Sequence, residues 1–78
     1  MIGNTKNDWG VRAARFLKAE LKRADLTYDQ LAEKLSNHGL LETKASIANK
    51  LSRGTMSAAF FLATLAVIGR PKVDLSEV

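Results

Sequence analysis

The sequence predicts an all-α protein that folds as a compact bundle of four helices, with five as the alternative. In three successive segments, apolar residues recur every three or four positions, which is the spacing of amphipathic helices. A fourth segment, residues 58–68, is almost entirely apolar. An Asp, Thr or Ser that can cap a helix precedes each segment, and a glycine follows three of them.

Length and composition limit the classes of protein that this chain can represent. Its 78 residues suffice for one domain with one core. The formal net charge of +4 and a pI near 9.8 favour an anionic partner. With no cysteine and one histidine, we expect no metal, no cofactor and no thiol chemistry. The N-terminus lacks a signal peptide and the apolar runs are shorter than the ~20 residues of a membrane span, so we expect a cytoplasmic protein without a membrane partner.

The N-terminal part of the chain predicts an arm followed by a long helix. Residues 1–7 have no periodicity and are expected to form a loose arm, after which Asp8 caps a helix over 9–24. One arc of this helix is basic, and we interpret it mainly as a solubilising face that makes about one or two phosphate contacts. Its members are Arg12, Arg15, Lys18, Lys22 and Arg23.

Glu20 interrupts the apolar side of this first helix. A carboxylate in that position needs a partner if it is buried. Arg53 is the first candidate and Lys50 the second, and either would connect this helix to the third. The alternative is a Glu at the exposed rim of the apolar stripe.

Thr27 and Gln30 form a capping-box pattern that begins a second helix. This helix should end near His38, where Gly39 supplies a left-handed cap. We interpret His38 as a capping residue and not as a catalyst. In the turn that follows, Leu40 and Leu41 are expected to tuck beneath the chain and close the core.

The third helix, residues 44–53, is capped by Thr43 and ended by Gly54. Its apolar residues fall on one side, and small polar or basic residues are expected to point outward. Asn and Lys are side chains that contact base edges in a DNA major groove, whereas the alternative is an ordinary amphipathic helix with a polar outside. The outward residues, predicted to contact bases, are Lys44, Ser46, Asn49 and Lys50.

The fourth helix, residues 58–68, begins after Ser57 and contains Thr64 as its only polar residue. A helix that is apolar on every side must be covered on every side, so we expect it to contact a second copy of the protein. The alternative is a central helix enclosed by its own chain. Residues 70–78 are expected to form an extended, poorly packed tail; the alternative, from the alternation of Val73, Leu75 and Val78, is a tail that lies along a groove or pairs with a partner. The predicted dimer interface consists of Phe60, Phe61, Leu65, Val67 and Ile68.

LTYDQLAEKL, followed by SIANKLSRG and an apolar helix that ends in glycine, resembles the Cro and lambda-repressor-like helix-turn-helix family. The resemblance covers about residues 17–69, and it implies that residues 8–69 form a domain whose third helix enters the major groove of double-stranded DNA, usually as a homodimer. It places the four outward residues of 44–53 at bases. The expected DNA-backbone contacts are Thr27, Tyr28, Arg53 and Thr55.

A longer run, from ETKASIANK to LAVIG, is similar to a small group of bacterial single-domain proteins of unknown function. Two features depart from the helix-turn-helix family. The turn Ser36–Glu42 makes this region about five residues longer than is usual, which leaves normal docking and a tilted third helix as alternatives. Tyr28 replaces the usual Gln, and can donate one hydrogen bond to a phosphate.

The function that these patterns favour is sequence-specific DNA binding by a small transcriptional regulator. The alternative is a helical adaptor or antitoxin-like module that binds a protein partner on the same scaffold. RNA binding is a more distant alternative because the chain has few aromatic residues. We expect no enzymatic activity, since the titratable residues form no catalytic constellation.

Overall fold

The computed structural model describes residues 8–78 as an all-α bundle. The predicted arm, residues 1–7, lies outside the described residues. The four helices confirm the predicted fold class, with boundaries within one residue of those expected, and a short 3-10 helix follows them. The elements are α1 (Trp9–Arg23), α2 (Tyr28–Asn37), α3 (Lys44–Arg53), α4 (Ala58–Ile68) and η2 (Leu75–Glu77).

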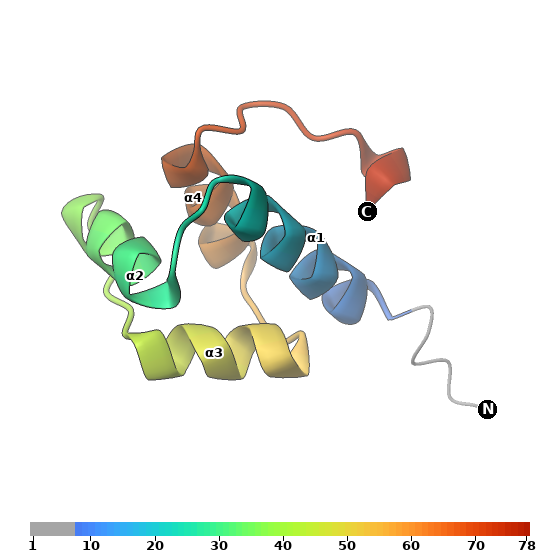
Figure 1. The fold of residues 1–78 in the computed structure, drawn as a ribbon. Helices are drawn as coiled ribbons and strands as arrows, with labels where there is room; N and C mark the ends of the chain where they lie inside the picture. The colour runs from blue at the N-terminus through green and yellow to red at the C-terminus, as the bar shows by residue number, and fades with distance from the viewer. Residues whose placement is uncertain (1–7) are drawn as a thin grey trace.

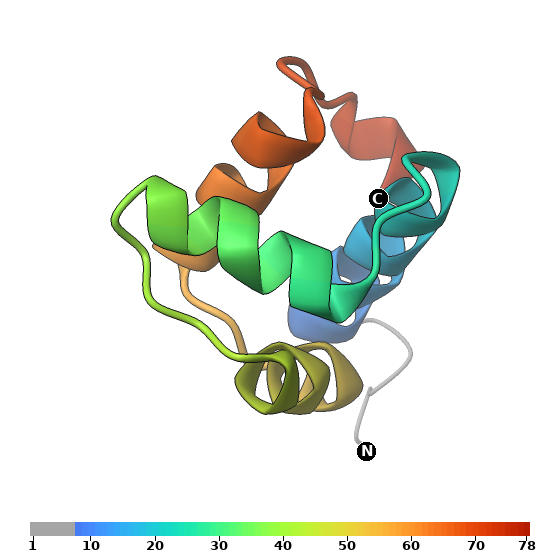
Figure 2. The ribbon, with the colours of Figure 1, turned by 60° about the vertical axis from the view of Figure 1, so that its left-hand side comes forward.

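The four helices surround one apolar core. α1 and α2 each contact both α3 and α4. In Figures 1 and 2, α3 lies along one side of the bundle, and the segment that follows α4 passes the opposite side of α1. The side chains at the centre of the core come from all four helices; the most deeply buried apolar ones are Leu17, Leu31, Leu35, Ile47, Leu51 and Phe60.

Local capping fixes where the helices begin. The Asp8 carboxylate accepts a hydrogen bond from the Gly10 amide at 2.8 Å, and the Thr27–Gln30 capping box forms as predicted. Thr43 forms a second capping box, with Ser46 in place of the usual Glu or Gln. Each such cap stabilises its helix by about 1 kcal/mol.

Two glycines bring the start of α1 against the end of α3. Gly54 ends α3 with a φ of 69°, in the left-handed region. A Cβ atom on Gly54 would lie 2.8 Å from the Gly10 carbonyl carbon and from the Val11 nitrogen, and a Cβ on Gly10 would overlap the Gly54 carbonyl oxygen. The two backbones approach this closely only because neither residue has a side chain.

The turn between α2 and α3 departs partly from expectation. Leu40 packs against the core, as predicted, but Leu41 is 82% exposed. The expectation that both leucines tuck beneath the turn is therefore wrong for Leu41. The chain is extended here, and consecutive side chains of an extended chain point to opposite sides.

The position of α4 corrects the predicted dimer surface. Phe60 and Leu65 are buried inside the bundle, so neither is available to a second copy of the folded protein. Phe61, Val67 and Ile68 are partly buried and pack against the same core. The exposed apolar face of α4 consists of Ala59, Leu62 and Ala66.

The C-terminal segment is packed against α1, so the expectation of a loosely packed tail is wrong and the alternative, a tail whose valines pack against the rest of the chain, agrees with the structure. Val73 and Val78 pack against the core. The Arg12 guanidinium donates to the main-chain oxygen of Val78 at 2.8 Å and 3.2 Å. The Arg70 guanidinium donates to the Glu77 carboxylate at 2.8 Å.

Glu20 is buried, but its partners are not those that the sequence suggested. Its carboxylate accepts hydrogen bonds at 2.6 Å from Arg70 and from Arg23. Arg53 and Lys50, the two predicted partners, belong to α3, whereas this side of α1 faces the C-terminal segment. The hydrogen bonds to Glu20 and Glu77 raise the pKa of the Arg70 guanidinium above its usual value.

Among residues 8–78, no single helix is long and apolar enough to cross a membrane. α3 and α4 meet the length and composition criteria only together, as a pair bent by 114°.

Candidate nucleic-acid interface

The exposed face of α3 carries the polar residues on which the functional prediction rests. Lys44 and Asn49 are both exposed, as expected. Ser52 and Arg53 continue this face toward the end of the helix. The helix presents an amide, a hydroxyl, an ammonium and a guanidinium group to solvent.

Ser46 and Lys50 were expected on the same outward face, and the structure corrects this. Both contact Glu42, whose side chain is only 7% exposed. The Ser46 hydroxyl donates to Glu42 Oε1 at 2.6 Å, and Lys50 Nζ donates to both carboxylate oxygens at 2.8 Å and 3.0 Å. Lys50 also lies over the Phe60 ring, 5.5 Å from its centroid.

This network gives the lengthened turn a structural role. Glu42 ends the turn, directly before the Thr43 cap, and its carboxylate binds two side chains of α3's first two turns. Sequence reasoning missed it because Glu42 stands eight residues before Lys50, outside the helix that they join. The sequence did contain a signal for this network. An acidic residue stands directly before the capping Thr, and two polar residues follow in the next helix.

The expected DNA-backbone residues lie near this face or close to the start of α2. Arg53 and Thr55 are exposed at the end of α3 and just beyond it. Thr27 is exposed as the cap of α2, and Tyr28 is partly buried.

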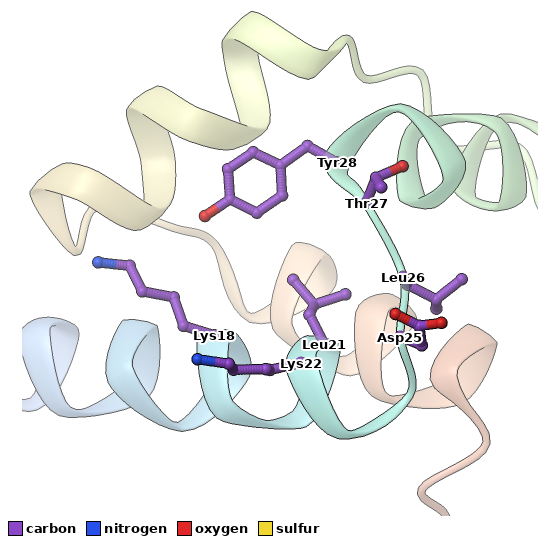
Figure 3. Close-up of a pocket in the computed structure, with 7 residues that line it drawn as sticks. All are labelled: Lys18, Leu21, Lys22, Asp25, Leu26, Thr27 and Tyr28. Atoms are coloured by element: carbon purple, nitrogen blue, oxygen red, sulfur yellow. The ribbon is translucent and has the colours of Figure 1, made fainter.

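Tyr28 lines a hollow of about 290 Å³ between α1 and the start of α2. Lys18 and Lys22 stand on its α1 side, and Figure 3 shows the Tyr28 hydroxyl directed toward the side where Lys18 lies. A smaller hollow of about 140 Å³ lies between α1 and α3, where Lys18 again contributes, together with Arg15 and Ser52.

The two hollows make one polar strip that extends from the start of α2 along α1 to the end of α3. We call this the α1 basic strip, with Lys18 shared by both hollows and Lys22 one helical turn away. The sequence analysis assigned these lysines mainly to solubility. Their spacing of four residues on α1 was the available signal, because it places both on one helix face.

Other chemistry-bearing residues are dispersed. Among residues 8–78, no group of three His, Cys, Asp or Glu side chains could hold a metal ion. His38 ends α2 as expected, with Nδ1 2.9 Å from the Lys34 carbonyl oxygen. Since a carbonyl only accepts hydrogen bonds, Nδ1 carries the proton in this contact.

The fold and this surface together define a small all-helical domain with a polar and basic face on α1, α2 and α3. The chain belongs to the family described as Domain of unknown function (DUF6471), whose model matches residues 9–73. No curated protein and no solved structure matches the chain.

Proposed function

We propose that this protein binds double-stranded DNA sequence-specifically as a small transcriptional regulator, and that α2 and α3 act as a helix-turn-helix of the lambda-repressor-like kind. The observation that carries the proposal is the exposure of Asn49 and Lys44 on α3, together with a hollow between α1 and the end of α3 that Lys18 and Arg15 line. DNA recognition needs both parts, because base contacts specify the sequence and phosphate contacts fix the orientation.

Asn49 and Lys44 are the base-reading residues in this proposal. An Asn side chain can pair with adenine through two hydrogen bonds, and a Lys ammonium donates to guanine. The proposal does not include Ser46 and Lys50 among the residues that contact bases, because their polar atoms already contact Glu42. They stabilise the start of α3 and thereby position Asn49.

The phosphate contacts come from two places. Lys18 and Lys22 line the hollow beside Tyr28, so a phosphate there would meet two ammonium groups and a phenolic hydroxyl, against one carboxylate from Asp25. Thr27, Arg53 and Thr55 are exposed near the two ends of the same face. The association constant for DNA should therefore depend on salt. On a plot of its logarithm against the logarithm of the salt concentration, each neutralised phosphate should add about −0.9 to the slope.

The test begins with selection of binders from a random duplex pool, followed by titration of the selected duplex. Asn49→Ala should reduce affinity for that duplex by about 1–3 kcal/mol, or roughly 5- to 150-fold, and should relax the preference at one base position. Asn37→Ala is the matched control, because Asn37 is also exposed but lies at the end of α2.

A second pair of variants separates base reading from general attraction. Lys44→Ala should reduce affinity for the selected duplex more than for a scrambled one, whereas Lys34→Ala removes the same charge from the exposed side of α2. If no sequence is enriched, or if Asn49→Ala and Asn37→Ala behave alike, sequence-specific DNA binding is wrong.

We further propose that the protein acts as a homodimer through the exposed face of α4. Leu62 is 64% exposed at the centre of this face, with Ala59 and Ala66 one turn to either side. Leu62→Glu should give monomers in sedimentation experiments, whereas Leu41→Glu, on a leucine outside α4 that is 82% exposed, should not. A wild-type monomer at about 100 μM would contradict this.

The second candidate function is a helical module that binds another protein. It is favoured by four large apolar side chains exposed among residues 8–78, two of which, Trp9 and Leu75, line one hollow and so form a contiguous patch of the kind that marks interaction surfaces. A dimer that enriches no duplex sequence would support this candidate over DNA binding. The four residues are Trp9, Leu41, Leu62 and Leu75.

A further inference from the structure

A second kind of hollow lies away from α3, between α1 and the C-terminal segment. Its volume is about 440 Å³, within the usual range for small-molecule sites. In Figures 1 and 2 the C-terminal segment passes α1 on the side opposite to α3. A duplex that contacts α3 would therefore lie mainly on the other side of α1, and Arg15 is the one lining residue that this hollow shares with the hollow between α1 and α3.

Arginine dominates the lining of the hollow. Four guanidinium groups and two carboxylates face it, which gives its side chains a net charge of +2. The apolar part of the wall is Phe16, with Ala19 beside it. The charged residues are Arg12, Arg15, Arg23, Arg70, Glu20 and Glu77.

The two carboxylates are already occupied by the protein's own arginines. Arg70 donates to Glu20 at 2.6 Å and to Glu77 at 2.8 Å, and Arg23 also donates to Glu20. Arg70 in addition donates to the Lys72 carbonyl oxygen, so each of its three nitrogens has a partner. Arg70 therefore holds the wall together and has little capacity left for a ligand.

The other three arginines retain unused donors. Arg12 uses only Nε and one terminal nitrogen, both toward the Val78 oxygen. Arg23 uses one terminal nitrogen, toward Glu20. Within the described residues, Arg15 has no ion-pair or side-chain hydrogen-bond partner. Guanidinium groups match phosphate because they donate two parallel hydrogen bonds.

We propose that this hollow, which we call the arginine pocket, binds the phosphate of a small phosphate monoester, with Arg15 and Arg23 as the principal donors and Arg12 at the edge. A monoester carries nearly two negative charges at neutral pH, which complements the net positive charge of the lining side chains. Phe16 and Ala19 then contact the organic part of the ligand. The proposal is independent of DNA binding by α3.

The probe is phenyl phosphate, titrated at pH 7.5 and constant ionic strength into the full chain, with amide chemical shifts as the readout. We expect saturable shifts in α1 and in residues 70–78. Dimethyl phosphate carries one negative charge, as each phosphate of a DNA backbone does, and should bind at least about tenfold more weakly. Inorganic phosphate should bind through the same residues.

Two variants make the test specific. Arg15→Gln should weaken phenyl phosphate binding about tenfold, which corresponds to ~1.4 kcal/mol, and among residues 8–78 it removes no ion pair or side-chain hydrogen bond. Lys18→Gln is the matched control on the same helix, because Lys18 lines only the hollows facing α2 and α3. It should leave phenyl phosphate binding unchanged.

Three results would overturn the proposal: no saturable shift, equal binding of the diester and the monoester, or equal loss in Arg15→Gln and Lys18→Gln. None of them bears on whether the selected duplex binds α3. Loss of duplex binding with retained phenyl phosphate binding would overturn the proposed function and leave the arginine pocket standing.

Discussion

Replacing Gly10 by Ala tests the packing of α1 against α3. In a solvent-exposed helix this change is stabilising by about 0.8–1.0 kcal/mol, because Ala is the better helix former. Here the added Cβ would overlap the Gly54 carbonyl oxygen, whereas ordinary van der Waals contact begins at 3.4 Å. The end of α3 must then move away from α1, and overpacking of this kind costs about 1–3 kcal/mol.

The expected net result is a loss of about 1–2 kcal/mol in the free energy of unfolding, measured by urea denaturation monitored by circular dichroism. Because a 78-residue domain shifts by about 4–8 °C per kcal/mol, the Tm should fall by roughly 4–16 °C. Displacement of α3 should also weaken binding of a selected duplex, since Asn49 and Arg53 move with the helix.

The Gly54→Ala and Gly39→Ala pair supplies the control. Both glycines have positive φ, so both variants bear the cost of about 1 kcal/mol for a left-handed Ala. Only at Gly54 does the Cβ also meet backbone, because nothing lies within 4 Å of a Cβ on Gly39. A Gly10→Ala protein more stable than wild type, or equal losses at Gly54 and Gly39, would refute the close approach of α1 and α3.

Three further changes test individual contacts. Thr64→Val should stabilise the fold by about 1 kcal/mol in urea titrations, since within the described residues the buried Thr64 hydroxyl has no hydrogen-bond partner; a loss of stability would reveal one. Glu42→Gln should destabilise it by about 1–2 kcal/mol because Lys50 loses its counter-charge, whereas the same change at exposed Glu33 should have little effect. Hydrogen bonds from Ser76 lower the pKa of Asp74, so this carboxylate stabilises the C-terminal segment above its ordinary pKa and loses that effect as the pH falls through its folded value. Ser76→Ala should therefore raise the Asp74 pKa in a carboxyl-carbon NMR titration, and an unchanged value would contradict the assigned cause.

The elements that the sequence predicts well are those encoded by neighbouring residues. The caps at Thr27 and Thr43 and the left-handed end at Gly54 depend on residues three or four positions apart, and each forms. The buried side of α3 is also predicted well, because the periodicity of its apolar residues defines it. Fold class follows from these signals together.

What the sequence does not predict depends on contacts between distant residues. Glu20 could be identified as needing a partner, but only one of its two partners, Arg23, is local; the other, Arg70, is fifty residues away in a segment with little periodicity. Lys50 and Asn49 are both polar residues of α3 that the sequence pattern predicts to be exposed. The path of the preceding turn, which the pattern does not specify, brings the Glu42 carboxylate to Lys50 and not to Asn49. The sequence of α4 likewise does not indicate which side of the helix faces the core, because a uniformly apolar helix has no polar side to mark the exposed face.

The basic arc of α1 shows how such distant contacts divide one sequence feature into two. Five positive residues on one helix suggest a single anionic partner, but the C-terminal segment packs beside Arg12 and Arg23, whereas Lys18 and Lys22 line the hollow at the start of α2. Arg15 lies between the two groups and lines hollows on both sides. If the two sides are separate sites, Lys22→Gln should weaken duplex binding without changing phenyl phosphate affinity, and Arg23→Gln should do the reverse. Parallel losses in both variants would mean that α1 presents one continuous basic surface.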